Sequence, residues 1–253
     1  MLPDLEILIA NDNTYLLMKN NDLIGKELRL HGDFAKSERI CCEKFLVNKD
    51  KVVVIDIGAN IGTFTIGVAK LLQKIDGKVI CFEPQRIVFQ QLCANIFLNQ
   101  LENVHAFNLA VGEKNKTVEL PIIDFHKSTN PGGFSVNDDI RSHLNQEYKK
   151  GTTASNTYQS TLSEKMQIIT IDSLKIDDEI AFLKIDVEGG ELEVLIGAQN
   201  TLKKNRYPPI VFEDWGSKFS WYEEKSTKTF EFIKSIGYEI TPLEGRNFLA
   251  VHP

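Results

Sequence analysis

The chain has 253 residues, of which 42% are hydrophobic and 25% charged, the composition of a globular protein with one large or two small domains. Its 29 basic and 35 acidic residues give a net charge of −6, which disfavours nucleic-acid binding through phosphate neutralisation. The sequence has no run of about 18 apolar residues, so we expect no membrane span. Asp4 and Glu6 near the N-terminus argue against a secretory signal, so we expect a cytoplasmic protein.

The four cysteines occur without a CxxC pair or zinc-type Cys/His spacing. We therefore expect reduced thiols and no metal site.

Residues 1–50 are predicted to form a small N-terminal appendage. Tyr15–Met18 and Glu27–Leu30 are candidates for a pair of short strands, and Ala35–Val47 for a leading helix. No linker-like stretch follows, so residues 51–253 are predicted to form one α/β domain.

From residue 51, apolar strands alternate with amphipathic helices. The expected strands are 52–58, 78–84, 103–112, 180–189, 209–215, 238–240 and 248–251, and the expected helices are 62–73, 86–99, about 190–204 and 225–236. This alternation predicts a mostly parallel sheet with helices on both faces. The last two strands have no helix between them, which indicates that they pair antiparallel at the end of the domain.

The stretch 124–165 differs from the rest of the domain. It is rich in Ser, Thr, Asn and Gly and includes Asn130-Pro131-Gly132-Gly133, after a short strand expected at Lys116–Leu120. We expect an irregular insertion, either a substrate lid or a flexible excursion.

The sharpest motif is Asp56-Ile57-Gly58-Ala59-Asn60-Ile61-Gly62, which closes the first strand of the domain and opens a helix. Ligands of open α/β sheets bind at such strand ends. The glycine spacing is G-x-x-x-G, whereas a pyrophosphate loop is G-x-G-x-x-G. The Asp56 carboxylate would repel a phosphate and suits a ligand that presents an ammonium group.

Glu83 ends the next strand. A carboxylate there can accept hydrogen bonds from two adjacent ribose hydroxyls. A ligand with an ammonium group and a ribose, but no phosphate, is described better by S-adenosylmethionine than by NAD.

Five segments in order complete this pattern: VIDIGANIGTFT, CFEPQ, NLAVG, ITIDSL and FLKIDVEGGELEVLIGA. Together they resemble the FkbM-type family of S-adenosylmethionine-dependent methyltransferases over roughly residues 33–241. The resemblance implies a class I methyltransferase (Rossmann-like) fold. Its seven-stranded sheet is mostly parallel and its last strand antiparallel.

The resemblance also implies roles for single residues. It puts Asp56, Gly58, Ala59, Asn60 and Gly62 around the methionine part of the donor, Glu83 at the ribose, Pro84 and Gln85 beside the adenine, Asn108 and Ala110 over the base, and Asp186 and Glu188 near the reacting methyl.

Three carboxylates at strand ends are candidate bases for deprotonating an acceptor: Asp186, Glu188 and Glu213. Lys184 lies two residues before Asp186, so both share one face of the strand. Lys184 either holds Asp186 ionised and offers a cation to a substrate oxygen, or forms a structural salt bridge with it. Glu188 alternatively caps the following helix. We expect catalysis to rest on Asp186, Lys184 and Glu213.

These observations predict an O-methyltransferase that acts on a hydroxyl group of a sugar, a glycan or a small-molecule metabolite. An N-methyltransferase and a non-catalytic adenosine-ligand-binding module remain alternatives. A nicotinamide oxidoreductase is disfavoured by the glycine spacing.

Overall fold

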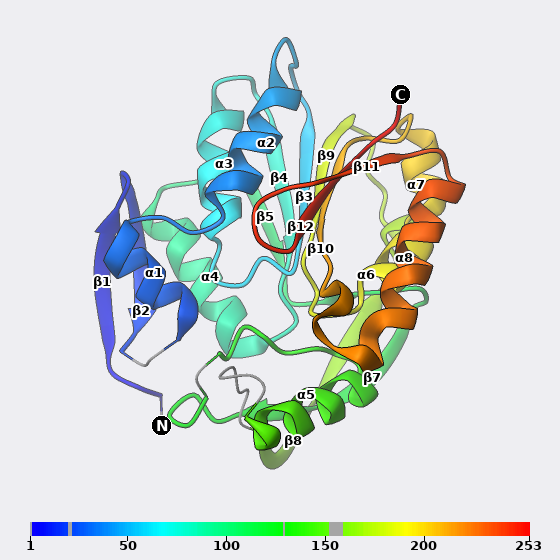
Figure 1. Cartoon of the computed structure of the whole chain (residues 1–253). Coiled ribbons are helices and arrows are strands. Elements are labelled where there is room, and N and C mark those ends of the chain that lie inside the picture. Colours follow the sequence, from blue (N-terminus) through cyan, green and yellow to red (C-terminus); the bar gives the residue numbers. More distant parts are fainter. Residues whose placement is uncertain (1, 20–21, 129, 152–158) are drawn as a thin grey trace.

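The computed structural model describes residues 2–19, 22–128, 130–151 and 159–253. Its centre is a seven-stranded sheet with the order β11-β12-β10-β9-β3-β4-β5 (Figure 1). The strands are β3 (Val53–Ile57), β4 (Lys78–Phe82), β5 (Val104–Phe107), β9 (Ile180–Ile185), β10 (Ile210–Glu213), β11 (Glu239–Pro242) and β12 (Asn247–Val251). β12 is antiparallel to both neighbours, and the pairs from β10 to β5 are parallel. The predicted sheet is thus confirmed.

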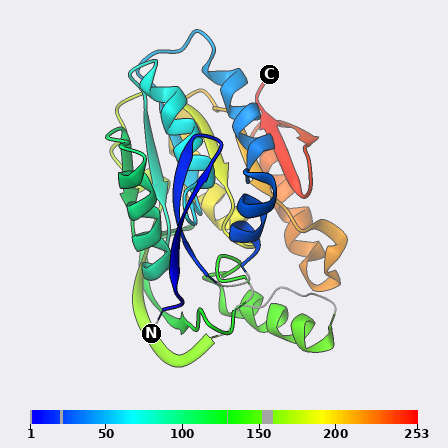
Figure 2. The same ribbon diagram turned by 90° about the vertical axis from the view of Figure 1, so that its left-hand side faces the viewer.

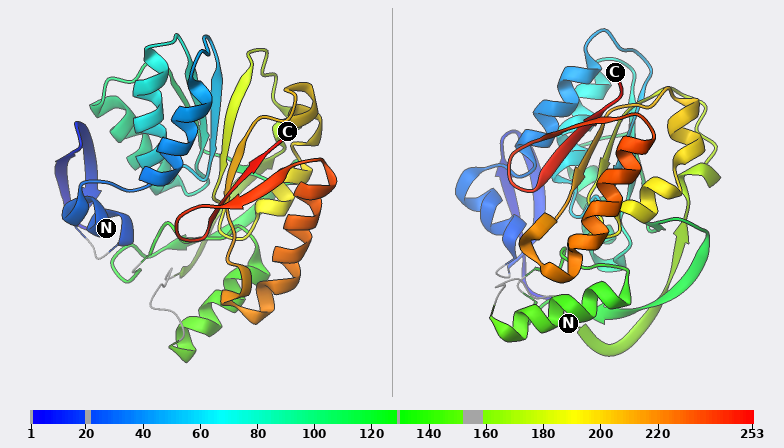
Figure 3. Two further views of the ribbon diagram at one scale, coloured as in Figure 1. Left: turned by 45° about the horizontal axis from the view of Figure 1, so that its top comes forward. Right: turned by 45° about the vertical axis from the view of Figure 1, so that its right-hand side comes forward.

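Helices cover both faces of this sheet (Figure 3). One layer holds α2 (Lys36–Leu46), α3 (Thr63–Gln73) and α4 (Arg86–Leu98), and the other holds α6 (Glu191–Ile196), α7 (Gln199–Lys204) and α8 (Glu223–Ser235). Alternate side chains of β3 face the two layers. Val54 packs with the first layer, and Val53 and Ile55 pack with the second. Because both faces are covered, every residue of β3 is buried.

The N-terminal segment forms a hairpin of β1 (Leu5–Ala10) and β2 (Asn13–Met18), followed by α1 (Leu23–His31). The hairpin packs beside α4 (Figure 2), where Asn95 Oδ1 accepts a hydrogen bond from the Leu16 amide at 2.6 Å. The expected strand at Glu27–Leu30 is wrong. Those residues belong to α1, whose first turn is capped by Asp22 through the Gly25 amide. The leading helix is confirmed as α2, and the domain boundary near residue 50 stays a prediction.

A second, three-stranded sheet has the order β6-β8-β7 and consists of β6 (Ala110–Val111), β8 (Gln159–Ile169) and β7 (Lys116–Ile123). The single strand expected at 103–112 is wrong, because the chain leaves the central sheet after Phe107 and pairs with β8 from Ala110. Asn108 occupies the corner between them and donates from Nδ2 to the carbonyl oxygens of Glu83 and Pro84, at 2.9 Å each.

The expectation of an irregular stretch at 124–165 is wrong in part, since it contains α5 (Asp138–Lys150) and the first half of β8. The Asn137 side chain begins α5 by accepting from the amides of Asp139 and Ile140. Thr129 and residues 152–158 of this stretch lie outside the described residues. α5 lies beyond the ends of the central strands (Figure 1).

The helix expected to run to Lys204 is divided into α6 and α7 at Gly197. A Cβ atom there would lie 2.1 Å from the Gly112 carbonyl oxygen, so glycine is needed for this close approach. Among the described residues, no helix is long and apolar enough to cross a membrane.

Candidate functional site

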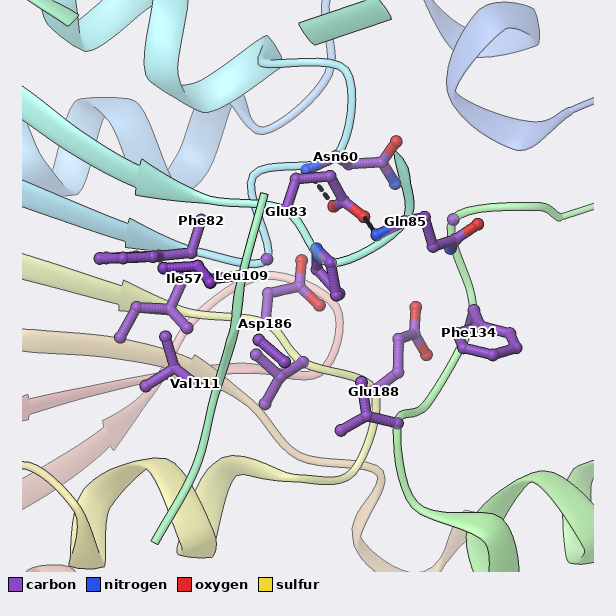
Figure 4. A pocket seen from close by; sticks show the side chains of 16 residues that line it. Ile57, Asn60, Phe82, Glu83, Gln85, Leu109, Val111, Phe134, Asp186 and Glu188 are labelled. Carbon is purple, nitrogen blue, oxygen red and sulfur yellow. Dashed lines mark hydrogen bonds between the residues drawn. The ribbon is translucent and has the colours of Figure 1, made fainter. Parts of the chain in front are cut away.

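A pocket lies at the carboxyl ends of β3, β4 and β9 (Figure 4). Its walls are formed by Ile57, Gly58, Asn60, Phe82, Glu83, Pro84, Gln85, Leu109, Ala110, Val111, Gly132, Phe134, Val136, Asp186, Val187 and Glu188. We call it the donor pocket. Seven of the residues expected at the cofactor line it: Gly58, Asn60, Glu83, Pro84, Gln85, Ala110 and Asp186.

The glycine loop forms one wall of the donor pocket. Gly58 has a φ of 84°, and a Cβ atom on it would lie 1.8 Å from the Asp186 carbonyl oxygen. Only glycine allows this approach of β3 to β9. Gly62 has a different role, because a Cβ atom there would lie 2.7 Å from a methyl carbon of Leu92. Gly62 therefore allows α3 and α4 to pack closely and does not line the pocket.

Glu83 holds the loop in place from the end of β4. Its two oxygens accept hydrogen bonds from the backbone amides of Asn60 at 3.0 Å and Gln85 at 2.8 Å (Figure 4). Burial raises the pKa of Glu83 to about 7, although both hydrogen bonds act in the opposite direction. Each oxygen retains acceptor capacity for a ligand hydroxyl.

Asp56 does not line the pocket. Its side chain is 0% exposed, accepts from Thr65 Oγ1 at 2.6 Å and forms an ion pair with Lys184 Nζ at 3.3 Å. The expected contact between Asp56 and a ligand ammonium is therefore wrong. Asp56 neutralises a buried lysine beneath the loop.

Lys184 is also buried, with Nζ 3.3 Å from Asp186 Oδ2 as well as from Asp56. The expected shared face of Lys184 and Asp186 is confirmed. Lys184 lines neither the donor pocket nor the larger pocket beside it, so it acts on the site through Asp186. The two neighbouring carboxylates raise its pKa despite burial, and it stays protonated.

Two further residues expected at the cofactor, Ala59 and Asn108, stabilise the backbone around the pocket. The Ala59 amide donates to the Phe82 carbonyl oxygen at 2.9 Å, and Asn108 ties down the chain after β4 as described above. Neither side chain lines the pocket.

A second, wider pocket opens beside the first, and we call it the acceptor pocket after the substrate that the sequence predicts. The two pockets share Asn60, Gly132, Phe134, Asp186 and Glu188. The remaining walls are Leu23, Ile24, Phe34, Asn130, Gly133, Arg141, Leu144, Asn145, Glu213, Trp215, Lys218, Phe219 and Arg246. The insertion at 124–165 thus contributes several walls of this pocket, and its role as a substrate lid stays a prediction.

Asp186, Glu188 and Glu213 meet where the two pockets join, with carboxylate oxygens within 4.8 Å of one another. Two of them have cationic partners in the protein: Asp186 pairs with Lys184, and Glu213 accepts from Arg246 Nη2 at 2.8 Å. In the described part of the chain these are the three side chains best spaced to share a divalent cation. Protein cations thus already balance two of the three carboxylates. The expectation of no metal site stays a prediction.

Glu188 does not cap α6, so that alternative is wrong. The N-cap of α6 is Gly190, without a side-chain hydrogen bond. Glu191, the first residue of α6, instead holds the preceding turn, since its Oε1 accepts from the amides of Val187 and Gly189 at 3.2 Å each. Glu188 instead points into the donor pocket (Figure 4). The cations Arg141, Lys218 and Arg246 were missed from the sequence, because each comes from a loop or helix without a motif.

Comparison with known proteins agrees with this arrangement. The sequence profile of the methyltransferase FkbM domain matches residues 56–240. The 2-O-methyltransferase NoeI of Sinorhizobium fredii is 26% identical over 182 residues, which cover 67% of this chain and 66% of NoeI. The methyltransferase sdnD of Sordaria araneosa is 28% identical over 180 residues, or 64% of this chain and 66% of sdnD. The chain thus matches slightly under two thirds of the length of either relative.

Among solved structures, a candidate O-methyltransferase from Klebsiella pneumoniae superposes with a TM-score of 0.50 at 13% sequence identity, over 91% of this chain and 88% of that one. The likeness shows the fold, which is that of a class I methyltransferase.

S-adenosylmethionine is the cofactor of FkbM methyltransferases, and the donor pocket fits it. Glu83 is placed for ribose hydroxyls, and apolar Phe82, Leu109 and Val111 line the adjoining wall. Gln85 Oε1 is buried without a hydrogen-bond partner among the described residues, so it can accept from a ligand amino group.

Proposed function

Because the chain belongs to the FkbM methyltransferase family, we propose that it transfers a methyl group from S-adenosylmethionine to a hydroxyl group of a sugar, a glycan or a small-molecule metabolite. The observation that carries this proposal is the joining of the two pockets at Asp186 and Glu188. A donor in one pocket and an acceptor in the other would meet at these carboxylates.

When bound, S-adenosylmethionine supplies a methyl group that is already activated by its sulfonium leaving group. The protein must hold the acceptor oxygen in line with that methyl. Good alignment alone can contribute several kcal/mol, up to about 7–11 in the most favourable cases. Asp186, fixed by Lys184 at 3.3 Å, is placed to orient the acceptor hydroxyl. Glu213, held by Arg246, forms the far side of the same junction.

Three features support a hydroxylated acceptor. Phe34, half-buried in the wall of the acceptor pocket, offers an aromatic surface on which the apolar face of a sugar ring can pack. The carboxylates at the junction are acceptors for hydroxyl donors. The related NoeI is named a 2-O-methyltransferase.

The test is methyl transfer from methyl-labelled S-adenosylmethionine to a panel of monosaccharides, oligosaccharides, hydroxylated small molecules and matched amines, with products identified by mass spectrometry. Transfer to oxygen in at least one hydroxylated acceptor is expected. Transfer to the amines alone would contradict the proposed function.

A further inference from the structure

We propose that Glu188 is the general base that takes the proton from the acceptor hydroxyl during methyl transfer. This inference rests on the proposed function and names the residue that performs its proton-transfer step.

The position of Glu188 is the first argument. It follows β9 by three residues and lines both the donor and the acceptor pocket. Its backbone has a φ of 56°, a left-handed conformation that is rare outside glycine. Gly189 follows with a φ of 90°. This double turn directs the Glu188 side chain into the pocket, where Figure 4 shows its carboxylate near Asp186 and Phe134. Strained backbone of this kind is concentrated at functional sites.

The second argument is that Glu188 is the uncommitted carboxylate of the junction. Asp186 is held by Lys184, and Glu213 by Arg246 and by Trp215 Nε1 at 3.1 Å. Glu188 has no hydrogen bond or ion pair with any residue that the structure describes. A carboxylate paired with a cation is a weak base, whereas an unpaired one can accept a proton.

The charges around Glu188 strengthen its basicity. The groups that act on it are the carboxylates of Glu213, Asp186 and Glu191 and the cations of Arg246 and Lys218. Burial, followed by repulsion from Glu213, holds the pKa of Glu188 well above its usual range. The Glu188 carboxylate therefore binds a proton more strongly than an ordinary glutamate does.

The acceptor oxygen forms a bond to the methyl carbon while its proton passes to a Glu188 oxygen. The carbon–sulfur bond breaks, and its electron pair stays on sulfur, which becomes a neutral thioether. Glu188 ends as a neutral carboxylic acid and returns its proton to solvent through the open acceptor pocket.

The test compares Glu188→Gln with the wild type in single-turnover methyl transfer, using a hydroxylated acceptor from the panel. We expect a loss of about 10²- to 10⁴-fold in the transfer rate. The rise of the residual rate with pH should also disappear, and the dissociation constant for S-adenosylhomocysteine should change less than about threefold. The matched control is Glu224→Gln, since Glu224 is exposed on α8 and, among the residues that the structure describes, pairs only with Lys228. An unchanged rate and pH profile in folded Glu188→Gln would overturn the proposal.

A second measurement needs no acceptor. As Glu188 ionises in its acidic surroundings, the wild type should lose thermal stability with rising pH, and Glu188→Gln should lose less. If no hydroxylated acceptor is methylated, the proposed function fails, and this comparison still decides whether Glu188 titrates. Superimposable stability curves would overturn its role as base. Turnover that requires Mg²⁺, with Glu188→Gln losing calorimetric Mg²⁺ binding, would overturn it too, because Glu188 would then be a metal ligand.

Discussion

At the scale of single residues, the most exacting arrangement is Lys184 between Asp56 and Asp186. Removing one partner of a buried ion pair leaves a buried charge uncompensated, which typically costs about 3–5 kcal/mol. Asp56 is 0% exposed, so Lys184→Met should lower the free energy of unfolding by about this amount. Urea denaturation measures the loss.

The double variant Asp56→Asn/Lys184→Met should recover part of that stability, because it leaves no unpaired buried charge. Lys49→Met is the control, since the Lys49–Glu179 pair is at the surface and should contribute less than about 1 kcal/mol. A Lys184→Met protein as stable as the Lys49→Met control would show that the buried pair is not structural.

The same residues show which features of the site can be predicted from the sequence and which cannot. Gly58 and Glu83, both expected at the cofactor, line the donor pocket. A glycine turn and a strand-end carboxylate are local signals that the sequence alone can supply. Asp56 was assigned to the ligand, since its sequence position does not reveal that its side chain turns toward Thr65 and Lys184. That direction depends on the register of β3 against β9, where Asp56 lies opposite Lys184.

At the scale of elements, α5 depends on Arg141. The side chain is buried, donates from Nη1 to the Ser135 carbonyl oxygen at 2.7 Å and lies 5.0 Å from the centre of the Phe134 ring. Hydrogen bonds from charged groups contribute about 1.5–3 kcal/mol. Arg141→Met should therefore lower hydrogen-exchange protection in α5 by roughly 10- to 150-fold.

Protection of β3 should not change in that variant, because the central sheet does not depend on α5. Lys149→Met on the same helix is the control, since Lys149 is exposed. Equal protection of α5 in both variants would mean that Arg141 does not hold the helix in place.

α5 also explains why the acceptor pocket was not predicted. Its sequence is polar, and the composition of the surrounding stretch indicates a loop. The helix is held by local contacts of Arg141 with Ser135 and Phe134 and by long-range contacts of Ile140, which packs with Trp215 and Tyr222. Such contacts join segments about 75 residues apart and leave no local pattern.

At the scale of the whole molecule, buried carboxylates set the pH dependence of stability. Burial raises the pKa of Glu83 to about 7 and that of Glu191 to about 8, from a usual 4.5. At pH values between the usual pKa of 4.5 and these raised pKa values, the folded state binds more protons than the unfolded state. The free energy of unfolding should therefore fall by a few kcal/mol as the pH rises from about 4.5 to about 8.

Urea denaturation of the unliganded protein across this range measures the effect, and Glu83→Gln should reduce the slope between about pH 4.5 and about pH 7. Stability that rises over the same range would contradict the environments described for Glu83 and Glu191.

The overall architecture was largely predictable because parallel strands buried on both faces have nearly continuous apolar sequences, as in β3 and β9, which each contain one charged residue. The β6-β8-β7 sheet, in contrast, could not be predicted from the sequence. β6 has only two residues, Ala110 and Val111, and its pairing with β8 spans the whole insertion.

The central claim is that the donor pocket binds S-adenosylmethionine through Glu83. Calorimetric titration of the wild type and Glu83→Gln with S-adenosylmethionine and NADH tests it most directly. We predict micromolar binding of S-adenosylmethionine, no binding of NADH, and an affinity for S-adenosylmethionine weakened in Glu83→Gln by about 1–3 kcal/mol, or roughly 5- to 150-fold. Binding of NADH without S-adenosylmethionine, or equal affinity of folded Glu83→Gln and the wild type for S-adenosylmethionine, would contradict it.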